Sequence, residues 1–398
     1  MDGGGGAADG RPYLFRLTGP PEAEPQKRVG ASCDRPDRKE LRMPWWFKRR
    51  LFAAPLALAL FALAACSNAS ANGGSVACGS SSGSTVINFA AYSTPREVYD
   101  AKIIPTFVKE WKDKTGQTVL FNESYAGSTT QAQNVVNGLG SDVVALSLAP
   151  DIQTIQDAGL ITHDWTQAPD GGMVSASVAV FDVRPGNPKG IKDWSDLATA
   201  GTGVLTPDPA QSGGARWNLV ALWGAALRGD VTGIAKGDEA AATTLMQAVT
   251  HNVISYDKSA RDSIQNFESG NGDVAITYEN EVKTAQAAGE PDTAVYPKGT
   301  VLIENPVAVV DKNAQAHCVE DVANAFVDYL HTKEAKGFYS TVGYLRPVDP
   351  AKAAAGDPAN GFPAIHELFT VADLGGWDAL DQKLFSDTGI ATQAIAQG

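Results

Sequence analysis

Short apolar runs typical of β-strands alternate with helical patterns along most of this 398-residue chain. Stretches with helical spacing separate the runs, and this alternation is typical of α/β sheets with mostly parallel strands. The region that alternates holds about 315 residues, which is too many for one ordinary hydrophobic core. We therefore expect an α/β protein of two lobes, without an internal repeat. The runs lie at residues 86–91, 118–122, 143–148, 177–183, 203–206, 253–256, 274–278 and 306–310.

Two extended stretches mark where the chain would cross between the lobes. SASVAVFDVRPGNPKGIKDW at 175–194 and AVYPKGTVLIENPVAVVDK at 294–312 each combine apolar strand residues with proline and glycine. Two long crossings that bracket a middle segment are what a hinge requires. We expect an outer lobe of residues 84–181 plus 300–398 and an inner lobe of residues 182–299.

The segment MPWWFKRRLFAAPLALALFALAAC, which begins at Met43, has the pattern of an export signal. Three basic residues precede an apolar run at 51–65, and this run is shorter than the ~20 residues that span a bilayer. The segment ends in LAAC at 63–66, which resembles the lipobox of bacterial lipoproteins, where the cysteine is lipidated after cleavage. We expect Met43 to be the true start, residues 1–42 to be an over-extension, and Cys66 to carry lipid. An ordinary cleaved signal is the alternative.

Either signal places the mature chain outside the cytoplasm, as a lipoprotein anchored to the cell membrane or as a periplasmic protein. Residues 66–84 would then be the lipidated cysteine and a flexible Ser/Gly-rich tether. Without residues 1–65 the chain has 21 basic and 38 acidic side chains, a net charge of −17. Nucleic acid and anionic lipid demand basic surfaces, so neither is an expected partner, and membrane contact would come through the lipid alone.

Two cysteines remain in the mature domain, Cys78 and Cys318. An even pair in an exported protein favours one disulfide, and two isolated thiols are the alternative. Cys78 precedes the first strand, and Cys318 follows the strand at 306–310, which should return antiparallel to the first, so both should lie away from the cleft. The five histidines are scattered and no zinc-binding spacing occurs, so we expect no metal and no cofactor.

Three junctions repeat the order strand, serine, helix. Ser212 stands before the helical pattern of TPDPAQSGGARWNLVALWGAAL (206–227), Ser128 in YAGSTTQAQNVVNGL (125–139), and Ser259 in DKSARDSIQNFESG (257–270). The first turn of a helix presents N–H groups without internal partners at the positive end of its dipole. Because carboxyl ends of strands share one crevice in open α/β sheets, the junctions can meet around a small anion. The alternative is that all three serines merely cap their helices.

Seven segments in this order resemble the sulfate-binding subunit of bacterial ATP-binding-cassette (ABC) sulfate and thiosulfate importers. They cover both expected lobes between residues 85 and 380: STPREVY (93–99), ESYAGSTTQAQNVVNG (123–138), DVVALSLAPDI (142–152), VLTPDPAQSGGARWN (204–218), SARDSIQNF (259–267), GDVAITYENE (272–281) and LFTVADLGGW (368–377). The resemblance implies a type II periplasmic-binding-protein fold, with two lobes that are each a mostly parallel sheet flanked by helices. The ligand would lie in the cleft between them.

The resemblance also implies a donor set for a dehydrated sulfate. Arg216 and Arg261 would pair with nearby acceptors and would not touch the ion. Tyr278 stands where the family commonly has a tryptophan whose indole N–H donates, and Ser93 or Thr94 could complete the set if Tyr278 does not serve. The implied ligand-binding residues are Ser128, Ser212, Gly213, Gly214, Ala260 and Tyr278.

The implied function is capture of sulfate and its delivery to an ABC permease by a monomeric protein. Sulfate carries no proton at neutral pH, whereas the hydroxyl of hydrogen phosphate would stay unpaired among donors, at a cost of ~1–3 kcal/mol. Only Asp257 and Asp262 are carboxylates beside the three junctions. Because Tyr278 can also accept, thiosulfate, molybdate, tungstate and phosphate remain alternatives.

Other classes of function have little support in the sequence. GSSSG at 79–83 matches G-x-S-x-G but lies in the tether without a preceding strand, so we do not expect an enzyme. The chain has no Walker A pattern, so energy for transport would come from another subunit. A structural surface lipoprotein without a ligand is the remaining alternative.

Overall fold

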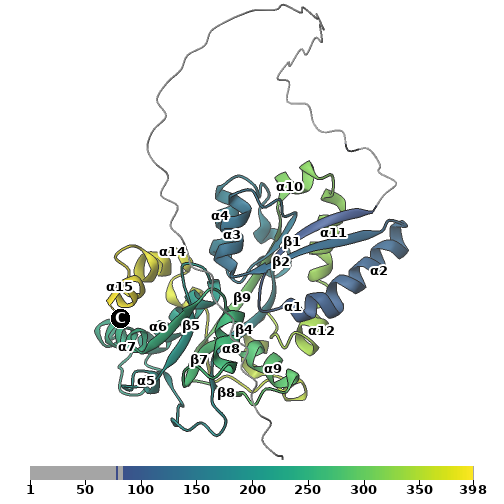
Figure 1. Ribbon diagram of the computed structural model, residues 1–398. Coiled ribbons are helices and arrows are strands. Elements are labelled where there is room, and N and C mark those ends of the chain that lie inside the picture. The colour runs from purple at the N-terminus through teal and green to yellow at the C-terminus, as the bar shows by residue number, and fades with distance from the viewer. Residues whose placement is uncertain (1–77, 79–83, 398) are drawn as a thin grey trace, which may run out of the picture. The chain divides into compact units, whose positions relative to one another are not determined.

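A continuous mixed β-sheet runs through the protein and supports the helices on its faces (Figure 1). The computed structural model describes Cys78 and residues 84–397, so the expectations for the leader, Cys66 and most of the tether lie outside the described residues. The main strand order is β2-β1-β3-β9-β4-β7-β5-β6, with β10 beside β9 and β8 beside β4. The strands are β1 (Thr85–Tyr92), β2 (Val119–Ala126), β3 (Val143–Ala145), β4 (Met173–Val183), β5 (Val204–Pro207), β6 (Val253–Asp257), β7 (Val274–Tyr278), β8 (Thr293–Val295), β9 (Gly299–Val309) and β10 (Glu367–Phe369).

The two long strands β4 and β9 lie in the middle of the sheet and pair antiparallel with each other. On one side β1 runs parallel to β2 and β3, and β3 pairs antiparallel with β9. On the other side β5 runs parallel to β6 and β7, and β7 pairs antiparallel with β4. We call the first group with its helices the outer half and the second the inner half. β4 and β9 are therefore the two crossings between the halves.

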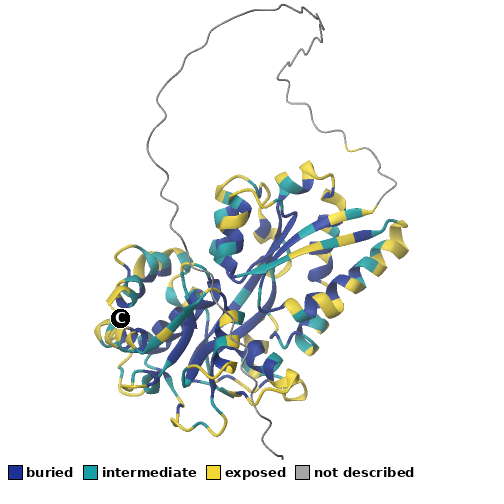
Figure 2. Ribbon diagram, in the orientation of Figure 1, coloured by how far each residue is buried: buried dark blue, intermediate teal, exposed yellow. Residues whose placement is uncertain are grey.

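Helices cover the sheet faces, and their exposed sides face away from the buried strands (Figure 2). Local signals set several ends: α2 has a proline in its first turn, and the glycines that follow α2 and α6, Gly116 and Gly229, each have a φ of 78°. The α-helices are α1 (Arg96–Val98), α2 (Ile104–Thr115), α3 (Ser128–Val136), α4 (Ala149–Asp157), α5 (Trp194–Leu197), α6 (Gly213–Arg228), α7 (Glu239–His251), α8 (Ala260–Glu268), α9 (Glu279–Ala288), α10 (Asp311–Ala316), α11 (Glu320–Leu330), α12 (Lys333–Thr341), α13 (Pro350–Ala355), α14 (Trp377–Leu380) and α15 (Ile390–Gln397).

Each half has a hydrophobic core of its own. Phe89, Phe107 and Phe326 pack together in the outer half, with the rings of Phe107 and Phe326 5.0 Å apart between centroids. In the inner half α6 is buried on nearly all sides, and its Trp217 belongs to the same cluster as Phe181. A helix that is apolar all round has to lie inside the protein, which explains why α6 begins deep between the halves.

The end of the chain packs against α6 and α7 of the inner half. We expected residues 300–398 to return to the outer lobe, but Phe369, Leu384 and Ala391 belong to the inner hydrophobic cluster with Trp217. Figure 1 shows α15, in yellow, beside α7 of the inner half. The apolar side chains of this last segment thus complete the core around α6 and α7.

The expected disulfide is confirmed. Cys78 and Cys318 are bonded, with their Cα atoms 5.4 Å apart. β9 runs antiparallel to β1, with β3 between them, so the two cysteines come to the same end of the outer half. Across the described residues, no helix has the length and apolar character needed to cross a membrane.

Candidate anion-binding site

The three predicted junctions meet at one small cavity between the outer and inner halves. The cavity has a volume of about 10 Å³, far less than the roughly 300–1,000 Å³ of sites for drug-sized ligands. A small ion therefore suits it better than an organic molecule. The residues that line it are Tyr92, Ser93, Thr94, Ala126, Gly127, Ser128, Ser147, Ser212, Gly214, Ala260 and Tyr278.

Three helix N-termini supply backbone donors here. α3 begins at Ser128 directly after β2, α6 begins at Gly213, and α8 begins at Ala260. The first N–H groups of a helix have no acceptor within the helix, and the helix dipole adds positive potential at the same end. Three such ends around one cavity favour negative charge there without any basic side chain.

The alternative that all three serines merely cap their helices does not fit the structure. Ser259 is a cap, because its hydroxyl accepts from Asp262 N at 3.1 Å. Ser212 occupies the N-cap position of α6 but makes no capping hydrogen bond with its side chain, and it lines the cavity instead. Ser128 is the first residue of α3, after the N-cap Gly127.

The Ser128 hydroxyl is engaged with a buried carboxyl that the sequence did not single out. It donates to Asp151 Oδ2 at 2.5 Å and accepts from Ser147 N at 2.9 Å. Asp151 is 2% exposed, and burial raises its pKa to about 6, against the lowering effect of the Ser128 hydrogen bond. The Ser128 hydroxyl is thus engaged within the protein, where it positions the loop that contains Ser147.

Four side-chain hydroxyls that line the cavity have no hydrogen-bond partner among the described residues. They belong to Tyr92, Thr94, Ser147 and Tyr278. Burial raises the pKa of Tyr278 well above its ordinary value, so the phenol keeps its proton and can donate. The sequence singled out Thr94 and Tyr278 but missed Tyr92 and Ser147. Tyr92 lies at the carboxyl end of β1, and Ser147 lies just beyond that of β3. Both could have been predicted, because the carboxyl ends of strands face the same crevice in open α/β sheets.

No charged side chain is among the described residues that line the cavity. Arg261 pairs with Glu281 at 2.7 Å and with Glu97, and Arg216 pairs with Asp381. The two arginines are thus held by acceptors beside the site. The carboxylates considered from the sequence also point elsewhere: Asp262 accepts from Ser259 at 2.9 Å, and Asp257 accepts from Asn266 at 3.1 Å.

The two halves are in close contact around the cavity. A Cβ atom on Gly127 of the outer half would lie 2.5 Å from the Gln211 carbonyl and 2.6 Å from the Lys258 carbonyl, both in the inner half. Gly213, which the sequence also singled out, does not line the cavity but lies against the Ser147 side chain, where a Cβ would be 2.2 Å from Oγ. The structure is therefore a closed form, in which a Cβ at position 127 would meet backbone atoms and a Cβ at position 213 would displace two side chains.

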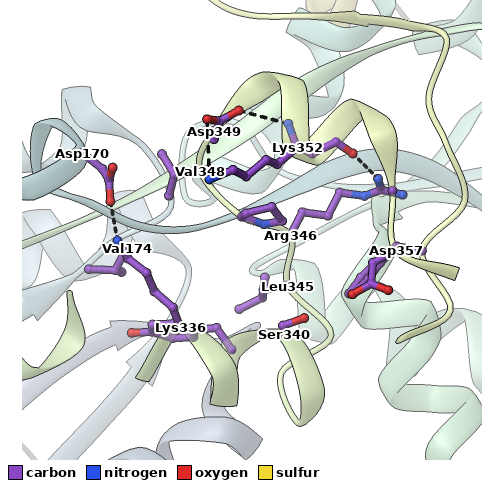
Figure 3. Close-up of a pocket in the computed structure, with 15 residues that line it drawn as sticks. Asp170, Val174, Lys336, Ser340, Leu345, Arg346, Val348, Asp349, Lys352 and Asp357 are labelled. Carbon is purple, nitrogen blue, oxygen red and sulfur yellow. Dashed lines mark hydrogen bonds and ion pairs between the residues drawn. The ribbon is translucent and has the colours of Figure 1, made fainter. Parts of the chain in front are cut away.

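A larger hollow, with a volume of about 370 Å³, lies between β4, α12 and α13 (Figure 3). Its basic side chains are already paired: Lys336 with Asp170 at 2.5 Å, Lys352 with Asp349 at 4.0 Å, and Arg346 with buried Glu279 at 2.6 Å. Because these carboxylates neutralise the cations, this hollow is a poorer anion site than the small cavity. Among the described residues, no group of His, Cys, Asp and Glu is arranged to hold a metal ion.

Comparison with known families identifies a model that covers more than half of the chain. The model for bacterial extracellular solute-binding proteins matches residues 87–345. A sulfate-binding protein from Synechococcus elongatus is 40% identical over 359 residues, which cover 88% of this chain and 97% of that protein. A sulfate-binding protein from Escherichia coli is 37% identical, over 76% of this chain and 91% of the relative.

A thiosulfate-binding protein from Escherichia coli is also related, with 34% identity over 78% of this chain and 90% of its own length. Among solved structures, the sulfate-binding protein SubI from Mycobacterium tuberculosis has 37% identity and a TM-score of 0.67, over 76% of this chain and 100% of that one. A periplasmic thiamin-binding protein has the same fold at a TM-score of 0.56 and 14% identity.

Proposed function

The chain belongs to the bacterial extracellular solute-binding proteins, and from that premise we propose that it captures sulfate outside the cytoplasm and delivers it to an ABC importer. The observation that carries the proposal is the uncharged cavity at three helix N-termini. Relatives named as sulfate-binding proteins support the choice of ligand. Such relatives are binding proteins, so we propose binding without catalysis.

We propose that the anion accepts hydrogen bonds from main-chain N–H groups and neutral hydroxyls. Backbone donors would come from Ser128, Gly214 and Ala260, which line the cavity. Gly213, beside the cavity in the first turn of α6, would add a further N–H, and Ser212 would add its hydroxyl. Tyr278 and Thr94 would donate from unpaired buried hydroxyls, and Ser93 lines the same cavity. Fixed dipoles of this kind can stabilise a dianion while leaving the net charge of the site unchanged.

Arg216 and Arg261 would act from outside the cavity. Each is held by carboxylates, and Arg261 additionally donates to the carbonyl of Thr94 at 3.2 Å. We propose that they keep the first turns of α6 and α8 and the loop after β1 in position. Their pairing with acidic groups also reduces the positive charge that would otherwise favour unrelated anions.

Thiosulfate is the second candidate ligand, because a thiosulfate-binding relative covers most of the chain. Tyr278 is a further reason to consider it, since a phenol differs in reach and accepting capacity from an indole. Sulfate remains the first choice because the relatives with higher identity are named for it.

We propose that the protein works next to the membrane. The signal and the LAAC sequence at 63–66 support export and attachment of lipid to Cys66, although these residues lie outside the described part of the chain. The tether would then keep the binding domain near permease subunits. Mass spectrometry of the membrane fraction should find a diacylglycerol-modified amino-terminal Cys66, and an unmodified mature chain would contradict the anchor.

Calorimetry of the purified mature protein against sulfate, thiosulfate, molybdate, tungstate and phosphate tests the ligand. We expect binding of one sulfate per chain and a rise in melting temperature with sulfate, because the ligand stabilises the folded form that binds it. If saturating sulfate changes neither the melting temperature nor tryptophan fluorescence, the sulfate proposal is wrong. Tighter binding of thiosulfate would replace sulfate with the second candidate.

A further inference from the structure

Two hydroxyls at the cavity have no role in the donor set described so far. Ser147 is 1% exposed and Tyr92 is 4% exposed, and neither hydroxyl has a hydrogen-bond partner among the described residues. Leaving a buried polar group unpaired is unfavourable, and these two share their cavity with the unpaired hydroxyls of Thr94 and Tyr278. Four such groups around one space indicate that a hydrogen-bond acceptor fills it.

We propose that Ser147 and Tyr92 are anion-binding residues, and that with Thr94 and Tyr278 they form a ring of four hydroxyl donors around the ion. The proposal deepens the proposed function and rests on it. The ring would supplement the main-chain donors of the three helix starts.

The main chain of Ser147 is fixed on both sides, which leaves only its hydroxyl available. Its N–H donates to Ser128 Oγ at 2.9 Å. Its carbonyl accepts from Trp217 Nε1 at 2.6 Å and from Asn305 Nδ2 at 3.3 Å. A hydroxyl on such a rigid support can bind a ligand without a large loss of conformational entropy.

Gly213 leaves room for this hydroxyl. A Cβ at position 213 would lie 2.2 Å from Ser147 Oγ and 1.9 Å from Leu148 Cδ2. Ser147 follows β3 in the outer half, whereas Gly213 begins α6 in the inner half. The Ser147 hydroxyl thus reaches the cavity only because the facing helix begins with a residue that has no side chain.

Ser147 and Tyr278 approach the cavity from opposite halves. Tyr278 ends β7 of the inner half, and its hydroxyl is as deeply buried as that of Ser147. An ion in the cavity would contact both halves at once. The Ser147 hydroxyl therefore would contribute to affinity only when the halves are closed.

Tyr92 is the last residue of β1 and adds a second phenol from the outer half. Burial, and then the neighbouring phenol of Tyr278, raises the pKa of Tyr92 well above its ordinary value. Tyr92 therefore keeps its proton at physiological pH, and like Tyr278 it has a hydrogen to donate.

Calorimetric titration of sulfate into Ser147→Ala and Tyr92→Phe tests the assignment. Each loses one hydrogen bond to a charged ligand, so we expect the dissociation constant to rise about 10- to 100-fold. The melting temperature without sulfate should not fall, because each change removes a hydroxyl that has no partner in the protein. A purely structural role would lower it.

The chain offers matched controls for both substitutions. Ser263→Ala removes another buried, unpartnered hydroxyl, which does not line the cavity. Tyr339→Phe removes a buried phenol that lies 3.0 Å from the Tyr99 hydroxyl. Sulfate affinity should be unchanged in both. Thr94→Ser and Thr94→Val form a further pair, of which only the valine variant should lose affinity.

The outcomes separate this proposal from the function on which it rests. A wild-type protein that binds no sulfate contradicts the proposed function. If the wild-type protein binds sulfate and both Ser147→Ala and Tyr92→Phe bind it equally tightly, only the hydroxyl ring is overturned. The two hydroxyls then face ordered water. Loss of affinity in the controls as well would also overturn it, because the effect would not depend on the cavity.

Discussion

The backbone N–H of Thr130 donates to the carbonyl of Gln211 at 3.0 Å, and this bond joins the first turn of α3 to the loop before α6. It crosses from the outer to the inner half beside the cavity. Together with the Trp217 bond to the Ser147 carbonyl at 2.6 Å, it characterises the closed form. An ion bound by donors from both halves should favour this form over an open one.

Closure should be visible in solution. We expect sulfate to reduce the radius of gyration, because its donors lie on both sides of the cleft. Scattering curves with and without saturating sulfate give the measurement, and identical radii would contradict closure.

Glu97→Gln weakens the cross-cleft pair with Arg261, and since Glu97 is 43% exposed we expect a loss of under ~1 kcal/mol in the free energy of sulfate binding. Asp113→Asn, at a surface pair with Lys109, is the control.

Gly213→Ala should prevent closure and leave the fold intact. Its Cβ would collide with Ser147 and Leu148 of the opposite half, a contact that exists only when the halves meet. We expect sulfate binding to be lost by calorimetry, with little change in the melting temperature of the free protein. Gly337→Ala is the matched control, because nothing lies within 4 Å of the added Cβ. Unchanged binding by Gly213→Ala would show that the cleft can adapt.

Tyr278→Phe should weaken sulfate binding by one to two decades. The change removes one hydroxyl donor to a charged ligand, which contributes ~1.5–3 kcal/mol. Stability without sulfate should change little, since the hydroxyl has no partner among the described residues. Tyr99→Phe, in the outer core, is the control for loss of a buried phenol. Equal affinity of Tyr278→Phe and the parent would make Tyr278 structural.

Reduction of the Cys78–Cys318 disulfide should destabilise the protein without changing the site. The bond joins residues separated by 240 positions, so it restricts the unfolded chain over most of the domain. We expect a loss of about 2–5 kcal/mol in the free energy of unfolding, measured with urea with and without reductant. The double variant Cys78→Ser with Cys318→Ser should be insensitive to reductant. Two free thiols in the exported protein would contradict the bond.

Asp151 should make stability fall as the pH rises. Its pKa is raised to about 6 in the folded protein from an ordinary 3.8, so the folded state binds the proton more tightly. This contribution is fully present below about pH 4 and is lost as the pH passes 6. The melting temperature of the parent should therefore fall relative to Asp151→Asn between pH 4 and pH 6. Asp157→Asn, on the exposed side of α4, should show the same change of melting temperature with pH as the parent. If Asp151→Asn also shows the parent's change, Asp151 is not its source.

Local sequence patterns determined much of the fold. Apolar runs flanked by turn residues predicted the strands, including the long crossings β4 and β9, because strand and helix periodicities are local properties. The three serine junctions predicted where helices begin, and the order of strands placed those helix starts at one edge of the sheet. The same reasoning about strand direction predicted that Cys78 and Cys318 would pair.

Tertiary packing decided which atoms face the cavity and which segments share a core. The sequence could not show that the Ser128 hydroxyl turns to Asp151 while the Ser147 hydroxyl stays free, because both depend on contacts between segments that are distant along the chain. Nor could it show that residues near Ala391 would pack on the inner half. A periodic pattern determines that a side chain is buried, whereas the partners of its polar atoms are decided only when distant segments pack together.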